Sequence, residues 1–130
     1  MASTPIFAAT PKVGVATLSL ADTPRTAPTN VGTVLTGGTS GTRVERVQIV
    51  ATSTTTAGIV RLFLYDGSAY HLISEVLVSA ITPSGTVAAF TATADFTAPG
   101  SVLLIPNGWS LRATTHNAEA FQVTAFGGDF

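Results

Sequence analysis

The sequence of 130 residues contains no cysteine and few charged side chains. Without cysteine, the chain cannot form disulfides, thiolate metal sites or a cysteine nucleophile. Charged residues make up 10% of the chain, whereas a soluble domain usually carries about 25%. The net charge is -1 and no basic run is present. This argues against nucleic-acid binding, which needs clustered Lys and Arg to neutralise phosphates.

Signals for membrane insertion and secretion are also missing. The longest uncharged stretch, residues 76–94, is interrupted by Pro83 and Gly85, so two strands around a turn explain it better than a membrane helix. No basic residue precedes Lys12 and no continuous apolar run follows the first methionine, unlike a secretory signal. We therefore expect no membrane partner.

Thr, Ala and Gly dominate what is present, with 53 of the 130 positions, and 45% of residues are hydrophobic. Low net charge with this hydrophobic content excludes intrinsic disorder. No window of about a dozen residues keeps the apolar spacing of an amphipathic helix, whereas short strand patterns recur between Gly, Pro, Asn and Asp. We predict about eight strands, one of them (32–36) short and optional, in the following ranges: 13–20, 32–36, 43–51, 58–65, 69–78, 86–94, 101–105, 109–115 and 119–126.

The clearest local prediction is a hairpin built from residues 58–65 and 69–78. Val60, Leu62 and Leu64 alternate with other residues and form a core face. Between the two strands lies Asp66-Gly67, a dipeptide that suits the positive φ angles of a type I′ turn.

Regular spacing of strands without helices predicts a single all-β domain: a jelly-roll-like β-sandwich of antiparallel strands, with a small barrel as the less favoured alternative. We expect residues 1–12 to form an extended N-terminal arm, because Pro5 and Pro11 interrupt strand pairing. Residues 13–130 then form the sandwich, in which 21–42 is a loop-rich segment.

No catalytic or metal-binding constellation emerges from the residue types. His71 and His116 are far apart and lack ligands at metal-binding spacing. Glu45, Glu75 and Glu119 fall in predicted strands, where cross-strand ion pairs with arginines on a solvated face explain them better than paired catalytic carboxylates. There is no Gly-x-Ser-x-Gly elbow, and the glycine-rich segment 37–41 lacks the following lysine of a phosphate loop. We expect no enzyme activity, no metal and no cofactor.

The shortage of charge points to assembly. A free monomer usually stays soluble through a charged surface, whereas Thr, Ser, Ala and Gly lose little rotamer entropy on burial against a neighbour. We predict a homo-oligomer. Ile6 and Phe7 in the arm are candidate partner contacts, with a disordered tail as the equal alternative.

Trp109 is a further candidate partner contact. With Tyr65 and Tyr70 it forms either a sugar-stacking platform or, as the favoured interpretation, aromatic packing at the edge of the core.

Three segments carry a family resemblance: residues 61–67 (RLFLYDG), 108–115 (GWSLRATT) and 118–130 (AEAFQVTAFGGDF). They resemble small all-β structural proteins of tailed bacteriophages and prophages, and the similarity covers about residues 43–130. The resemblance implies a capsid decoration (cement) protein or another minor virion protein, without cofactor. As the favoured function we expect a decoration protein that stabilises the phage head lattice as an oligomer such as a trimer.

On this resemblance the chain would be made in the bacterial cytoplasm and would lie on the head surface of the virion, bound to the major capsid protein or another virion protein. The resemblance supplies no catalytic residues. The alternative function is a carbohydrate- or receptor-binding module of a phage tail or fibre, with a glycan as partner.

Overall fold

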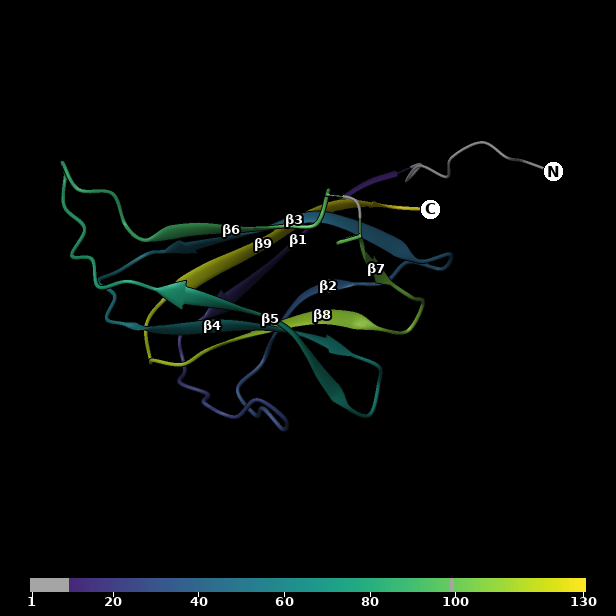
Figure 1. Cartoon of the computed structure of the whole chain (residues 1–130), viewed down its shortest axis with the longest axis horizontal. Helices are drawn as coiled ribbons and strands as arrows, with labels where there is room; N and C mark the ends of the chain where they lie inside the picture. The colour runs from purple at the N-terminus through teal and green to yellow at the C-terminus, as the bar shows by residue number, and fades with distance from the viewer. Residues whose placement is uncertain (1–9, 99) are drawn as a thin grey trace.

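The computed structural model describes residues 10–98 and 100–130, and within these residues the protein is all-β with two antiparallel sheets (Figure 1). The strands are β1 (Thr10–Leu18), β2 (Gly32–Thr36), β3 (Thr42–Ala51), β4 (Gly58–Tyr65), β5 (Tyr70–Val78), β6 (Thr91–Asp95), β7 (Leu103–Ile105), β8 (Ser110–Thr115) and β9 (Phe121–Asp129). Figure 1 shows the sheets as two layers, with the first and last strands side by side in one of them. The predicted single-domain β-sandwich is confirmed.

The two sheets differ in strand order. The five-stranded sheet has the order β1-β9-β3-β6, with β7 also paired to β3, and the four-stranded sheet has the order β2-β8-β4-β5. Apart from the β4–β5 and β6–β7 connections, each connection along the chain crosses from one sheet to the other. The chain therefore winds the two layers together around one core.

Alternation of side chains builds this core between the sheets. In β4, Val60 and Leu62 are fully buried and Leu64 packs against them, which confirms the predicted core face. The other buried apolar residues of the core are Ala16, Leu18, Val34, Leu35, Val44, Val47, Ile49, Ala51, Val78, Phe90, Leu103, Ile105, Leu111, Ala113, Phe121, Val123 and Ala125.

A bulge in β3 interrupts the regular alternation of its side chains. Strict alternation places Val44 and Val47 on opposite faces, yet both are fully buried. The register with β9 shifts between Val44 and Arg46, so Glu45 is the extra residue. The bulge lets both valines reach the core and turns Arg46 outward.

The N-terminal boundary also differs from the prediction. β1 begins at Thr10, and Pro11 lies within it, in register with Gly128. Residues 10–12 are thus strand rather than arm. Proline is tolerated here because β1 is an edge strand of its sheet. Ile6, Phe7 and the rest of residues 1–9 lie outside the described residues.

Two further strand limits were predicted wrongly. β6 begins at Thr91 rather than at residue 86. Its partner β3 ends at Ala51, whose N–H donates to the Phe90 carbonyl oxygen at 2.8 Å, and no residue of β3 remains to pair with the residues before Phe90. β9 continues past Phe126 through a glycine pair to Asp129. A Cβ at Gly127 would lie 1.9 Å from the Arg43 carbonyl oxygen, so only glycine lets β9 pass the bulged strand.

The β4–β5 hairpin turn is not of type I′. A type I′ turn needs a positive φ at both of its central residues. Gly67 has φ +102°, but no non-glycine residue in the described chain, and therefore not Asp66, has a positive φ. Instead the Asp66 carboxylate accepts hydrogen bonds from the backbone N–H groups of Ser68 and Ala69, at 2.9 and 2.8 Å. The side chain thereby closes the turn.

Candidate interaction surface

The outward side of the five-stranded sheet forms a flat surface of three rows, which we call the outer face. Its residues alternate with core-facing ones, which include buried residues in β1, β9 and β3 and are partly buried in β6. In strand order, the rows are Val13–Phe126–Arg46–Asp95, Val15–Thr124–Gln48–Thr93 and Thr17–Gln122–Val50–Thr91.

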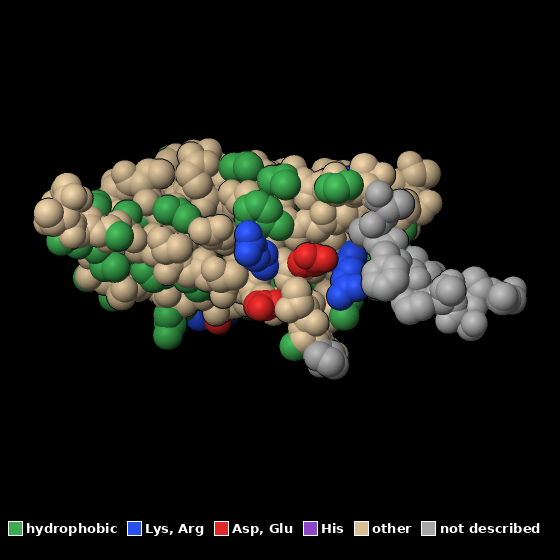
Figure 2. Space-filling model, turned by 90° about the horizontal axis from the view of Figure 1, so that it is seen from above, with side chains coloured by type: hydrophobic (Ala, Val, Ile, Leu, Met, Phe, Trp, Pro, Cys, Tyr) green, Lys and Arg blue, Asp and Glu red, His purple; other side chains and the backbone are tan. Residues whose placement is uncertain are grey.

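The outer face is almost uncharged and partly apolar. Val13 and Val15 are 60% and 54% exposed, although solvent-facing positions of a strand are usually occupied by polar residues. Figure 2 looks down on this face: most of it is tan, with separate green side chains and few blue or red groups. The exposed valines, together with the scarcity of charge, make this face inexpensive to bury against a partner.

Two of the charged residues on this side of the sheet, Arg46 and Asp95, are engaged within the chain, whereas Glu45, at the bulge of β3, is exposed. The Arg46 guanidinium lies over the Phe126 ring, 4.5 Å from its centroid. The Asp95 carboxylate accepts hydrogen bonds from the Thr97 hydroxyl and N–H, at 2.6 and 2.8 Å. These bonds, with a smaller contribution from Arg46, hold the pKa of Asp95 below its usual range.

Next to the outer face lies an apolar depression of about 480 Å³, lined by Ser40, Arg43, Val102, Leu104 and Phe130. Leu104 pairs with Arg43, and Gly128 on the next strand has no side chain to fill the surface beside them. Val102 and Leu104 are 48% and 53% exposed. The Arg43 Nε is buried and has no hydrogen-bond partner among the described residues.

The aromatic residues considered for a sugar platform do not share one surface. The Tyr65 ring lies on the central strand β4, between the Arg112 guanidinium (4.6 Å from its centroid) and the Tyr70 ring (4.4 Å between centroids). Trp109 instead packs against the core and stacks on His71, with 6.2 Å between centroids. Both flanks of Tyr65 are therefore occupied, and Trp109 is not beside it.

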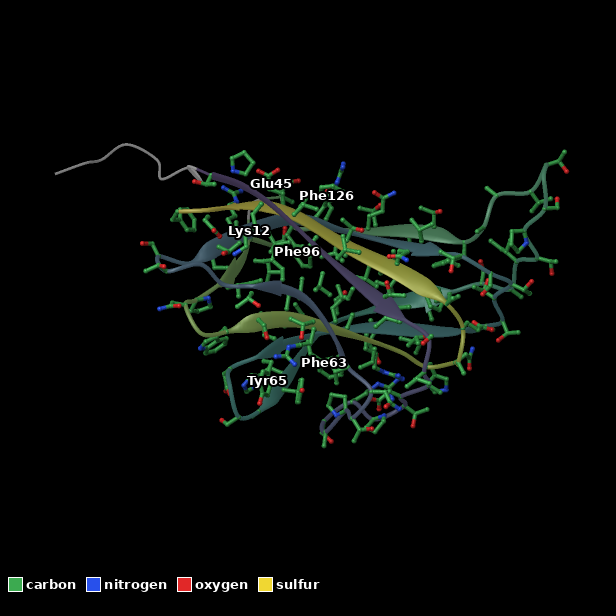
Figure 3. All side chains as sticks on the ribbon, turned by 180° about the vertical axis from the view of Figure 1, so that it is seen from behind. Lys12, Glu45, Phe63, Tyr65, Phe96 and Phe126 are labelled. Atoms are coloured by element: carbon green, nitrogen blue, oxygen red, sulfur yellow. The ribbon has the colours of Figure 1, made fainter. Side chains whose placement is uncertain are left out.

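Figure 3 shows how the labelled residues divide between the two layers. Phe63 and Tyr65 lie with the four-stranded sheet, whereas Phe126 and Glu45 lie with the five-stranded sheet. The aromatic cluster at the β4–β5 hairpin and the outer face are thus two different surfaces of the molecule.

Of the three glutamates predicted to form cross-strand ion pairs with arginines, Glu75 is the one that the described residues show in such a pair, and its environment differs from the prediction. Arg61 Nε and Glu75 Oε2 are 2.8 Å apart, but Arg61 is only 1% exposed rather than on a solvated face. Arg25, from the loop before β2, also contacts Glu75 Oε2, at 2.6 Å. Hydrogen bonds from Arg25 and Arg61 lower the pKa of Glu75.

Both histidines and Glu119 contact other side chains of the protein. His71 Nε2 lies 2.9 Å from Asp66 Oδ2, and His116 Nδ1 lies 3.3 Å from Arg61. Glu119, which precedes β9, accepts hydrogen bonds from the Thr56 N–H and hydroxyl, both at 2.8 Å. Within residues 10–98 and 100–130, no three His, Asp or Glu side chains converge as metal ligands.

In the described part of the chain, no helix has the length and apolar character to span a bilayer.

Sequence reasoning missed most of the residues that form these surfaces. It singled out Trp109, which lies against the core, and Ile6 and Phe7, which fall outside the described residues. The available signal was in β1, where Val13 and Val15 alternate with the inward Gly14, Ala16 and Leu18, so both sides of an edge strand are apolar.

Comparison with known proteins identifies no relative: no family model, no curated protein and no solved structure matches the chain. Its function is therefore argued from the surfaces described above.

Proposed function

We propose that the protein is a non-enzymatic structural subunit of a bacteriophage virion, a decoration protein that binds the head lattice as an oligomer. The observation that carries this proposal is the outer face, with its exposed Val13 and Val15 and its scarcity of free charge. The resemblance of residues 43–130 to phage virion proteins gives the type of partner.

Burial of the outer face is physically favourable. Val and Thr side chains lose less rotamer entropy on burial than Lys or Glu, and the exposed apolar area contributes about 25 cal/mol per Å² removed from water. Stable interfaces bury about 1,600 Å² in total. Such an area requires contacts beyond the three rows of the outer face, and the adjoining depression with Val102 and Leu104 extends the apolar surface.

The strand order supports a jelly roll as the finer description of the fold. The β1-β9-β3-β6 and β2-β8-β4-β5 sheets, with connections that cross between them, have the arrangement of two interlocked Greek keys. Viral capsid proteins use this architecture, and so do lectins, so the architecture agrees with the proposal without selecting it.

Co-sedimentation with phage heads that lack the protein tests the proposal. The wild-type chain should pellet with heads at a saturating ratio, and Val15→Asp with Thr124→Asp should weaken binding at least tenfold, because both positions lie on the outer face. Leu77→Asp is the matched control: Leu77 is 78% exposed on β5 of the other sheet. Absence of wild-type binding, together with a monomer at high concentration, would refute the proposal.

The carbohydrate-binding alternative makes a different prediction. A glycan-array signal that Trp109→Ala abolishes would support a receptor-binding module and contradict the decoration role. The stacking of Trp109 on His71 and its packing against the core lead us to expect no such signal.

A further inference from the structure

We propose that the apolar depression binds a small amphiphilic carboxylate, an anion that joins one carboxylate group to an aliphatic or aromatic body. The depression has a volume of about 480 Å³ and is lined by Ser40, Arg43, Val102, Leu104 and Phe130. Binding sites for small molecules usually have volumes of about 300–1,000 Å³ and combine apolar walls with a few polar groups. This inference concerns the isolated subunit and does not depend on the proposed role in the virion.

The apolar walls of the depression come from segments that the fold brings together. Val102, before β7, and Leu104, within it, are 48% and 53% exposed. Phe130 donates its N–H to the Gly41 carbonyl oxygen at 3.1 Å, and this bond holds the residue at the edge of the depression. Figure 1 shows β7, the start of β3 and the end of β9 at the same end of the molecule. A ligand between these walls removes apolar surface of both partners from water.

Arg43 supplies the cationic group of the depression, and its guanidinium has no partner among the described residues. It forms no ion pair and lies over no aromatic ring, and its buried Nε has no acceptor. The other four arginines are engaged within the chain: Arg25 and Arg61 with Glu75, Arg46 with Phe126, and Arg112 with Tyr65. Leu104 is the register partner of Arg43, so the two side chains lie on the same side of the sheet.

A single guanidinium among apolar walls selects the charge and the shape of the ligand. Its planar N–H groups match a carboxylate, to which they donate two parallel hydrogen bonds. One positive charge compensates a monoanion, whereas a dianion would leave a charge unpaired beside apolar surface. No acidic side chain lines the depression, and the neighbouring Asp129 pairs with Lys12 at 3.1 Å. The site therefore favours one carboxylate on an apolar body.

An NMR titration of the full chain with sodium octanoate tests the site. The methyl signals of Val102 and Leu104 should shift in a saturable way, whereas those of Leu77, which is 78% exposed on β5 of the other sheet, should stay in place. Octylammonium chloride is the matched control ligand, with an equal tail and the opposite charge. Absence of saturable shifts with octanoate would overturn the proposal, and so would equal shifts with both ligands, which indicate adsorption to an apolar patch.

Substitution of Arg43 tests the role of its guanidinium. Arg43→Gln should weaken octanoate binding about tenfold, because it removes charge-assisted hydrogen bonds to the carboxylate. Arg43→Lys should keep part of the affinity, since lysine retains the charge without the planar fork. Arg112→Gln is the matched control, because that guanidinium lies over the Tyr65 ring on the other sheet. Unchanged octanoate binding by the Arg43→Gln variant would contradict the assignment.

A second pair of variants separates binding from any contribution of Arg43 to folding. Val102 is half exposed and lies outside the strands, so the fold should tolerate either substitution. Val102→Asp should abolish octanoate binding, because it places a negative charge beside the carboxylate, and Val102→Leu should preserve it. Equal affinity of the two variants for octanoate would place the ligand elsewhere and refute the proposed site.

Discussion

Single glycines determine how closely the two sheets approach each other. A Cβ at Gly14 in β1 would lie 2.0 Å from the Val34 carbonyl oxygen of β2. Real Cβ atoms do not approach an oxygen so closely, and the obstacle is backbone rather than a flexible side chain. Because Gly14 has no side chain, this edge of the five-stranded sheet packs closely against the four-stranded sheet.

We predict that Gly14→Ala lowers the free energy of unfolding by about 1–3 kcal/mol, the usual cost of forcing extra atoms into a packed region. Urea denaturation measures the change. Gly85→Ala is the matched control, because a Cβ there meets nothing within 4 Å, and it should change stability little. Equal stability of the Gly14→Ala and Gly85→Ala variants would contradict this prediction, because it would show that β1 and β2 can move apart to admit a methyl group without loss of stability.

At this scale the sequence predicts residues whose role follows from alternation alone. Val60, Leu62 and Leu64 were assigned correctly to the core because β4 is regular along that face. Arg61 was not, because its burial depends on residues distant in sequence, such as Glu75 and Arg25, that cover and pair with it. No local pattern reports such a partner.

Among the elements, the loop between β1 and β2 is held to the four-stranded sheet by charge. Asp22 is buried and its Oδ2 accepts the N–H groups of Thr29 and Asn30, both at 2.6 Å, which folds the loop on itself. Arg25 then reaches Glu75 on β5, the same carboxylate that pairs with the buried Arg61. The loop and the strand therefore share one carboxylate.

Glu75→Gln should destabilise the protein more than Arg25→Gln. Loss of the Glu75 charge leaves the buried guanidinium of Arg61 without a counter-ion, whereas loss of the exposed Arg25 leaves the Arg61–Glu75 pair intact. Urea denaturation of both variants against the wild type measures the difference. A larger loss in the Arg25 variant would mean that anchoring the loop matters more than compensating the buried charge.

The ends of a strand could be predicted where turn residues mark them in the sequence. They could not be predicted where the length of the partner strand determines them. Gly32–Thr36 and Gly58–Tyr65 match the predicted strands. The start of β6 depends on the end of β3, and the extension of β9 through Gly127 and Gly128 depends on the bulge in β3. These are properties of a pair of strands, so one strand's sequence does not contain them.

For the whole molecule, four carboxylates make stability depend on pH. Hydrogen bonds hold the pKa below its usual range in each: Asp66 through His71 and then the Ala69 and Ser68 backbone, Glu75 through Arg25 and Arg61, Asp95 through Thr97, and Asp129 through Thr42 and then Lys12. A carboxylate whose folded pKa is lowered stabilises the fold above its unfolded pKa of about 4 and loses that contribution as pH falls through the folded value.

We therefore expect the thermal midpoint of unfolding to be level between about pH 5 and pH 7 and to fall as pH drops below about 4. Thermal unfolding followed by circular dichroism across this range measures it. Asp66→Asn should be less stable than the wild type near neutral pH and should lose less on acidification. A midpoint that stays constant or rises towards pH 2 would contradict the assignment.

The fold class of the whole molecule was predictable because strand periodicity, turn residues and the lack of helix patterns agree, and both sheets confirm it. The interaction surface was predictable only as a shortage of charge. Its position on the outer face depends on which strands become neighbours, since Val13, Phe126 and Arg46 come from three distant segments. The same shortage of charge now has a location, and it adjoins the apolar depression lined by Val102, Leu104 and Phe130.

The proposed decoration role is best tested by a density map of phage heads assembled in the presence of this protein. We expect β-sandwich density on the outside of the head, with the outer face of β1, β9, β3 and β6 covered by the capsid or by a neighbouring copy. Heads without such density, or a bound subunit whose outer face is open to solvent, would contradict it.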